Sequence, residues 1–245
     1  MNDGDRATRT LLTLAAVAVA FAAADTYVVV LALPDMMLTV GLGIDELQRA
    51  APIVSGFLLG YVAMLPLIGR IADIRGRVPV LVASLVVFAF GSLVTALAFD
   101  LPSVVTGRFL QGVGAGGLVP ATLALVADLY PAERRAVPLG VVSAVQEVGS
   151  VIGPLYGAVV LAVADWEAIF WLNLAVGLVL AAALTRLGTT AVDERRGASR
   201  PRVPDPLSLL LLVVALVSLV LLLWEPATLV SDFTTKVNTF ISHAD

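Results

Sequence analysis

The sequence predicts an all-α membrane protein, and three observations support this. Hydrophobic residues make up 59% of the 245 residues, charged residues only 14%, and the mean hydropathy is +0.98, whereas soluble domains are about half apolar and a quarter charged. Seven apolar stretches approach the roughly 20 residues that a helix needs to cross about 30 Å of hydrocarbon. Because these stretches lack the alternating pattern of barrel strands, all seven are expected to be helices.

The first six stretches are joined by short connections, which predicts a bundle of antiparallel neighbours. The first stretch follows Arg6 and Arg9 and is similar to a secretory signal, but its apolar run continues to Leu33. That run is too long for a signal core, so we expect an uncleaved first span. The six spans cover about residues 11–33, 51–69, 78–99, 102–126, 137–163 and 168–187.

A different organisation is expected after residue 187. Residues 188–205, with many charges and with Pro201 and Pro204, have the composition of a cytoplasmic linker. A seventh span is expected at 206–224 and a polar extracytoplasmic tail at 225–245. The expected domains are therefore a cytoplasmic N-terminus at 1–10, a six-helix bundle at 11–187, the linker, the seventh helix and the tail.

Basic residues are distributed unevenly between the two sides of the membrane. With a cytoplasmic N-terminus, twelve of the fifteen Lys and Arg residues fall inside, as the positive-inside rule requires. The basic loops therefore indicate topology in a bacterial inner membrane and not binding to nucleic acid. Cysteine is absent, His243 is the only histidine, and the spans contain no nucleophile and base pair. We therefore expect no metal, no cofactor and no enzyme activity.

Three charged residues lie inside the expected spans: Asp25, Arg108 and Glu147. Each costs at least about 2.5 to 3.5 kcal/mol at the bilayer centre, so each needs a reason. A rise of about 1.5 Å per residue places Asp25 roughly 12 Å and Arg108 roughly 9 Å below the outer surface, where they can face each other, and Glu147 near the midplane. One interpretation is a structural ion pair and a helix-to-helix hydrogen bond. The other is that the acids bind and release protons, because helix movement changes their surroundings.

Glycines recur every four residues in the same spans. The fifth span has Gly149, Gly153 and Gly157, with Pro154 beside the second, and the fourth has Gly112 and Gly116. This spacing indicates close helix packing in lipid, and the proline favours a bend.

Four motifs resemble those of the major facilitator superfamily and together cover residues 10 to 187. "DTYVVVLALP" at 25–34 is similar to the first-span motif of fourteen-span drug and proton antiporters. "GRIADIRGR" at 69–77 resembles the motif between spans two and three. "RFLQGVGAGG" at 108–117 and "GSVIGPLYGA" at 149–158 resemble the fourth-span motif and the fifth-span antiporter motif.

The resemblance implies roles for particular residues. Gly69, Asp73 and Arg77 would lock the cytoplasmic side, although Ile74 replaces a common arginine and leaves the partner of Asp73 open. Asp25, Arg108 and Glu147 would face the central cavity and serve proton coupling. Gly153 and Pro154 would shape a bend that lets the outer gate close.

The motifs look most like a mycobacterial branch that exports triacylglycerides and drugs. That resemblance implies proton-coupled efflux of hydrophobic or amphipathic substrates by alternating access, contact with membrane lipids, and help from a lipoprotein partner. The superfamily uses two six-helix halves, so the chain is expected to be an N-terminal half whose C-terminal half is missing.

A nontransporting half or regulatory membrane module remains an alternative. A retinal-type receptor is nearly excluded because the only lysine, Lys236, lies outside the spans.

Overall fold

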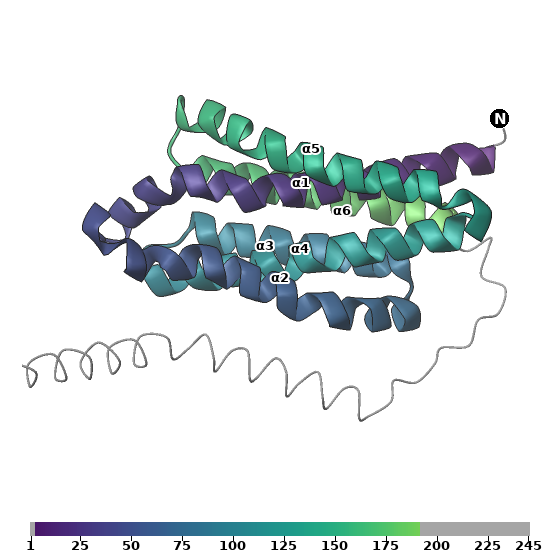
Figure 1. Ribbon diagram of the computed structural model, residues 1–245, viewed down its shortest axis with the longest axis horizontal. Helices are drawn as coiled ribbons and strands as arrows, with labels where there is room; N and C mark the ends of the chain where they lie inside the picture. Colours follow the sequence, from purple (N-terminus) through teal and green to yellow (C-terminus); the bar gives the residue numbers. More distant parts are fainter. Residues whose placement is uncertain (1–2, 192–245) are drawn as a thin grey trace, which may run out of the picture. The chain divides into compact units, whose positions relative to one another are not determined.

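The computed structural model describes residues 3–191, which form six long helices and two short 3-10 turns (Figure 1). All six helices are long and apolar enough to cross a membrane. The helices are α1 (Asp3–Thr39), α2 (Leu47–Arg75), α3 (Arg77–Ala96), α4 (Leu101–Leu129), α5 (Ala136–Leu161) and α6 (Glu167–Ala191), and the turns are η1 (Ile44–Glu46) and η2 (Ala132–Arg134).

The predicted all-helical, six-helix body is confirmed for this part of the chain. Residues 188–191, expected in the linker, instead continue α6. The rest of the linker, the seventh helix at 206–224 and the tail at 225–245 lie outside the described residues.

Helix ends follow the local sequence. Asp100 caps α4, since its carboxylate accepts a 2.9 Å hydrogen bond from the backbone N–H of Ser103. Hydrogen bonds with the side chain and then the backbone of Ser103 lower the pKa of Asp100. Between α2 and α3 the chain turns at Gly76, whose φ of +92° favours glycine. At the end of α4, the Arg135 guanidinium donates to the carbonyls of Ala127 and Tyr130, which the helix leaves unpaired.

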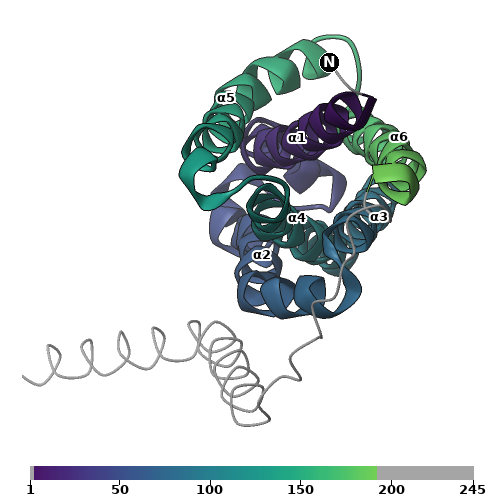
Figure 2. The same ribbon diagram turned by 90° about the vertical axis from the view of Figure 1, so that its right-hand side faces the viewer.

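The two central helices are α1 and α4 (Figure 2). Helix α1 packs against α5 and α6, α4 packs against α2 and α3, and α3 packs against α6. If α1, α2 and α3 are relabelled α4, α5 and α6, and the reverse, the same pairs of helices remain in contact. The contacts therefore follow two three-helix repeats, α1–α3 and α4–α6, in which the first helix of each repeat packs against the second and third helices of the other.

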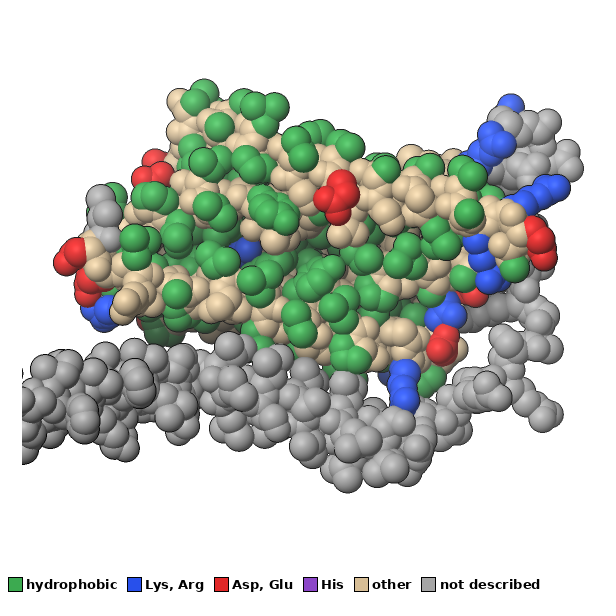
Figure 3. Space-filling model, viewed as in Figure 1, with side chains coloured by type: hydrophobic (Ala, Val, Ile, Leu, Met, Phe, Trp, Pro, Cys, Tyr) green, Lys and Arg blue, Asp and Glu red, His purple; other side chains and the backbone are tan. Residues whose placement is uncertain are grey.

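On the face shown in Figure 3, most charged side chains lie at the two ends of the bundle, and hydrophobic side chains are spread along its length, with an acidic side chain near the middle. The helix directions bring the start of α1 to the same end as the α2–α3 and α4–α5 turns. That basic end holds Arg6, Arg9, Arg70, Arg75, Arg77, Arg134, Arg135 and Arg186.

The glycine stripes lie at the closest helix contacts. A methyl group on Gly149 or Gly153 would come within 3.0 Å of the α1 backbone. The same holds for Gly112 and Gly116 against the α2 backbone, and for Gly157 against a valine side chain of α1. Glycine lets these backbones approach in lipid, where packing rather than the hydrophobic effect holds helices together. Pro154 lies inside α5, which is helical on both sides of it.

Replacing Gly149 with alanine is expected to lower the thermal unfolding midpoint of the purified chain. The added methyl group would collide with the carbonyl of Ala20, and overpacking costs about 1–3 kcal/mol. Gly140→Ala in the same helix is the matched control, because nothing lies within 4 Å of its added methyl group. Alanine favours helix by up to about 1 kcal/mol there, so this variant should unfold at the same or a higher temperature. Equal midpoints for the two variants would contradict the packing role.

Candidate functional site

A buried ion pair joins the two central helices. Arg108 of α4 donates from Nη1 to Oδ2 of Asp25 in α1 at 2.8 Å, and both residues are 1% exposed. The helical depths estimated from the sequence placed these residues at similar heights, and the structure brings them into contact. Because two charges are removed from water, the pair needs further hydrogen bonds to offset desolvation.

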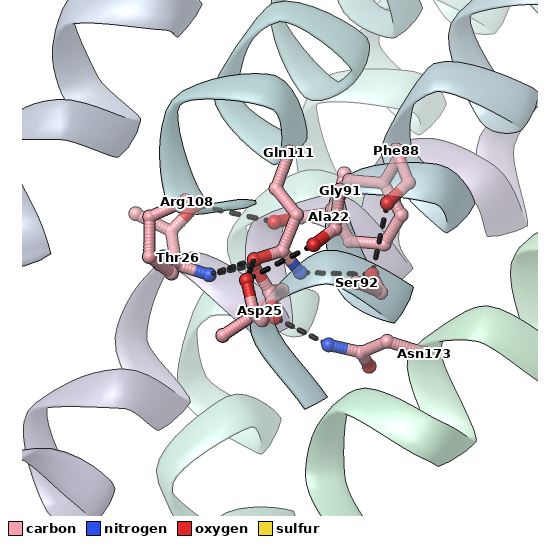
Figure 4. A network of polar contacts seen from close by, with 10 residues as sticks. Ala22, Asp25, Thr26, Phe88, Gly91, Ser92, Arg108, Gln111 and Asn173 are labelled. Atoms are coloured by element: carbon pink, nitrogen blue, oxygen red, sulfur yellow. Dashed lines mark hydrogen bonds and ion pairs between the residues drawn. The ribbon is translucent and has the colours of Figure 1, made fainter. Parts of the chain in front are cut away.

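A polar network around the pair supplies these hydrogen bonds (Figure 4). Asn173 of α6 donates to Oδ1 of Asp25. Gln111 accepts from Arg108 at 2.9 Å and donates to Ser92 of α3 at 2.9 Å. The network therefore ties α1, α3, α4 and α6 together.

Asn173, Gln111 and Ser92 were not among the site residues predicted from the sequence. Gln111 follows Arg108 by three residues and so shares its helix face. Asn173 stands alone in an apolar span, and a polar residue inside a span usually has a partner. These two signals were present in the sequence.

Aromatic rings complete the surroundings of Arg108. Its guanidinium carbon lies 4.4 Å from the ring centroid of Phe57 and 5.8 Å from that of Phe170. A desolvated cation over an aromatic face gains roughly 2 kcal/mol. The rings thus stabilise a charge that the bilayer would otherwise disfavour.

A cavity of about 180 Å³ lies between α1, α2, α4 and α5. Its wall includes Phe57 together with small and apolar side chains. The polar side chains on the wall are Thr26, Tyr27, Tyr61, Gln146, Glu147 and Ser150.

Glu147 is on this cavity, whereas Asp25 and Arg108 are not. All three were expected to face the central cavity between the two halves of the transporter, and this stays a prediction for Asp25 and Arg108, which do not line the present cavity. Phe57 is a neighbour of both, because it lines the cavity and its ring lies against the Arg108 guanidinium. Glu147 itself is exposed near the middle of α5.

A second polar cluster lies at the basic end. Arg77, at the start of α3, binds Asp73 of α2 at 2.6 Å and Asp128 of α4 at 3.1 Å. Arg77 is thus a partner of Asp73, a point that the sequence left open, and Asp128 is a partner that sequence reasoning missed. Gly69 has open space around it, so close packing does not explain its place in the motif.

The family follows from a comparison with protein-family models. The model described as Major Facilitator Superfamily matches residues 15–241. The chain belongs to the major facilitator superfamily. Its exchange pattern of helix contacts agrees with this, because the superfamily builds each six-helix half from two three-helix repeats.

Curated relatives are mycobacterial transporters. The chain is 44% identical over 215 residues to the triacylglyceride transporter of Mycobacteroides abscessus, covering 87% of this chain and 41% of the relative. It is 43% identical over 210 residues to that of Mycolicibacterium smegmatis, covering 85% and 37%. It is 42% identical over 222 residues to that of Mycobacterium tuberculosis, covering 89% and 42%. The chain spans about two fifths of the length of these relatives.

Solved structures show the same fold. A bacterial homologue of the human lysosomal transporter Spinster, in an inward-facing conformation, matches with a TM-score of 0.62 and 21% identity over 82% of this chain and 46% of that one. The human organic anion transporter TETRAN matches with a TM-score of 0.59 and 22% identity, covering 76% and 48%. The described body is therefore the N-terminal half of a major facilitator fold. The chain is a multi-pass membrane protein of the major facilitator superfamily, which is a family of transporters and not of enzymes.

Proposed function

We propose that this chain is the N-terminal half of a proton-coupled exporter of hydrophobic or amphipathic substrates. It works by alternating access with a C-terminal half, in a bacterial inner membrane and with its N-terminus in the cytoplasm. The basic end of the bundle supports this orientation, because cytoplasmic loops carry an excess of Lys and Arg.

The observation that carries the proposal is the position of Glu147. It is the carboxyl group on the wall of a cavity that otherwise has apolar, hydroxyl and amide side chains, and it lies near the middle of a membrane-spanning helix. Ionisable residues in spans that face a cavity typically belong to substrate or proton pathways. Glu147 and Asp25 bind and release the coupled protons, and Arg108 pairs with Asp25 while its carboxylate is ionised.

The basic end provides the conformational lock. Arg77 bridges helix ends from α2 and α4 through Asp73 and Asp128, and Gly69 belongs to the same segment. The glycine contacts of α5 with α1 and of α4 with α2 keep each pair rigid as the halves move. Pro154 removes a backbone donor and allows α5 to bend near the outer end.

The size and lining of the cavity indicate the substrate class. About 180 Å³ is less than the roughly 300–1,000 Å³ of drug-sized ligand sites, so this half supplies one wall of a larger site. The wall combines apolar side chains with hydroxyl, amide and carboxyl groups, which suits hydrophobic or amphipathic substrates such as lipids and drugs. The names of the relatives favour triacylglycerides, and a lipoprotein that accepts the exported lipid fits such a substrate.

Transport by reconstituted protein tests the proposal. The full-length protein, meaning this chain joined to its C-terminal half, is expected to export labelled triacylglyceride from vesicles with an imposed proton gradient. The 245-residue chain alone should export none, and collapsing the gradient should stop export. A cationic dye assayed in parallel shows whether drugs share the site. Gradient-independent export would refute proton coupling, and a full-length protein that transports neither substrate would favour a regulatory module.

A further inference from the structure

Asn173 of α6 is an amide held directly against the carboxylate of Asp25. Its Nδ2 donates to Oδ1 of Asp25, while Arg108 donates to the other oxygen, Oδ2 (Figure 4). Asn173 is 1% exposed. Its own oxygen, Oδ1, is buried and has no hydrogen-bond partner among residues 3–191. The amide therefore uses its donor and leaves its acceptor unused.

An unused acceptor beside a carboxylate matters when the carboxylate takes up a proton. The ionised form only accepts hydrogen bonds, whereas the protonated form also carries an O–H that must donate. A buried O–H without an acceptor is costly. Arg108 has donors but no acceptor, so it offers nothing to that proton. Asn173 Oδ1 is a buried acceptor within reach after a half-turn of the amide.

We propose that Asn173 is the positioning residue that lets Asp25 change its protonation state while it stays buried. The NH₂ group holds the carboxylate, and after the amide rotates, Oδ1 accepts the hydrogen bond of the carboxylic acid. The proton comes from water and adds to a carboxylate oxygen, and no other covalent bond changes. Oδ1 of Asn173 has no other partner in the described bundle. The rotation therefore breaks only the hydrogen bond from Nδ2 to Asp25, and the new hydrogen bond from the protonated carboxyl group replaces it. This inference rests on the proposed proton-coupled function.

The charged and titratable groups around Asp25 are few in the described bundle. Arg108 of α4 is in direct contact, Tyr156 of α5 lies within electrostatic range, and on α6 the nearest such group in sequence is Glu167. Gln111 and Ser92 link Arg108 to α3 without adding a charge. After protonation Arg108 keeps Gln111 and the two aromatic rings. Asn173 is then the neutral group that keeps α6 bonded to α1 in both states.

Nuclear magnetic resonance on the 245-residue chain tests this without any transport assay. The sequence has three asparagines, Asn2, Asn173 and Asn238, so a chain labelled with ¹³C and ¹⁵N at asparagine gives few side-chain amide signals. The chain is placed in lipid nanodiscs and titrated from neutral to acidic pH, while infrared spectroscopy follows the carboxyl band that Asp25→Asn removes. The NH₂ and carbonyl signals of Asn173 are expected to shift together, at the pH where that band appears.

Variants supply the assignment and the controls. Asn173→Leu identifies the signal, and if it fails to fold, Asn2→Gln combined with Asn238→Gln leaves Asn173 as the labelled amide. Asp25→Ala, which adds no labelled amide, should abolish the shift. Thr122→Val, which removes a buried hydroxyl without a hydrogen-bond partner, should preserve it. Protonation of Asp25 without any change at Asn173 would overturn the amide role and leave proton coupling standing. If Asp25 never takes up a proton, both the amide role and the part of Asp25 in the proposed function fail.

Discussion

Replacing Glu147 with glutamine is expected to abolish proton-driven export by the full-length protein and to leave the thermal stability of the 245-residue chain unchanged. Glutamine has nearly the same shape but carries no titratable proton. Glu147 is exposed on the cavity wall, so the substitution disturbs no tightly packed neighbour. A membrane potential of 100 mV contributes about 2.3 kcal/mol for each charge that crosses the membrane. Coupling to one such charge can therefore sustain a ratio of about fifty between the substrate concentrations on the two sides.

The matched control for this variant is Glu133→Gln in the turn η2. Glu133 is also exposed, but it lies at the basic end of the bundle and away from the cavity. Its replacement removes one negative charge, as in the first variant, and should leave gradient-driven export within about twofold of the unmodified protein, as surface changes usually have small effects. Full export by Glu147→Gln in reconstituted vesicles would remove Glu147 from the coupling mechanism.

The helices of the bundle and several of their contacts can be predicted from the amino-acid sequence. Lengths of apolar stretches predict where helices cross a bilayer, and the six helices of the described residues follow that prediction. Glycine spacing also predicts helix contacts, because residues four apart share a face and a missing side chain admits a second backbone. Gly112 and Gly149 lie in such contacts. Gly69 shows the limit of this reasoning, since a motif glycine can lie in open space.

The candidate site was harder to predict because sequence gives depth but not rotation about the helix axis. Depth placed Asp25 and Arg108 at similar heights. It did not show that Phe57 lies against Arg108, or that neither member of the pair lines the cavity. Nor did it show that Asn173, 148 residues along the chain from Asp25, reaches the same carboxylate. Such contacts depend on which face α6 turns toward α1, and this is set by packing across the whole bundle.

Breaking the Asp25–Arg108 pair is expected to have the largest effect on stability. Removing one partner of a buried ion pair leaves an uncompensated charge and costs about 3–5 kcal/mol. Arg49→Gln is the control, because Arg49 pairs with Glu46 at the surface, where such a pair contributes about 0–1 kcal/mol. Thermal unfolding of the 245-residue chain in detergent measures each variant. No difference between Asp25→Asn and Arg49→Gln would show that the buried pair does not stabilise the bundle.

The two single variants of this pair should differ from each other. Asp25→Asn leaves a buried guanidinium that cannot lose its proton in a protein, whereas Arg108→Gln leaves a carboxylate that can become neutral by taking one up. Asp25→Asn is therefore expected to be the more destabilising change. The double variant should be more stable than the sum of the single effects allows, because it removes both charges and the coupling between them. Such an asymmetry would indicate that the bundle tolerates a protonated Asp25 better than a stranded Arg108, which is the property that a proton-binding carboxyl at this position needs.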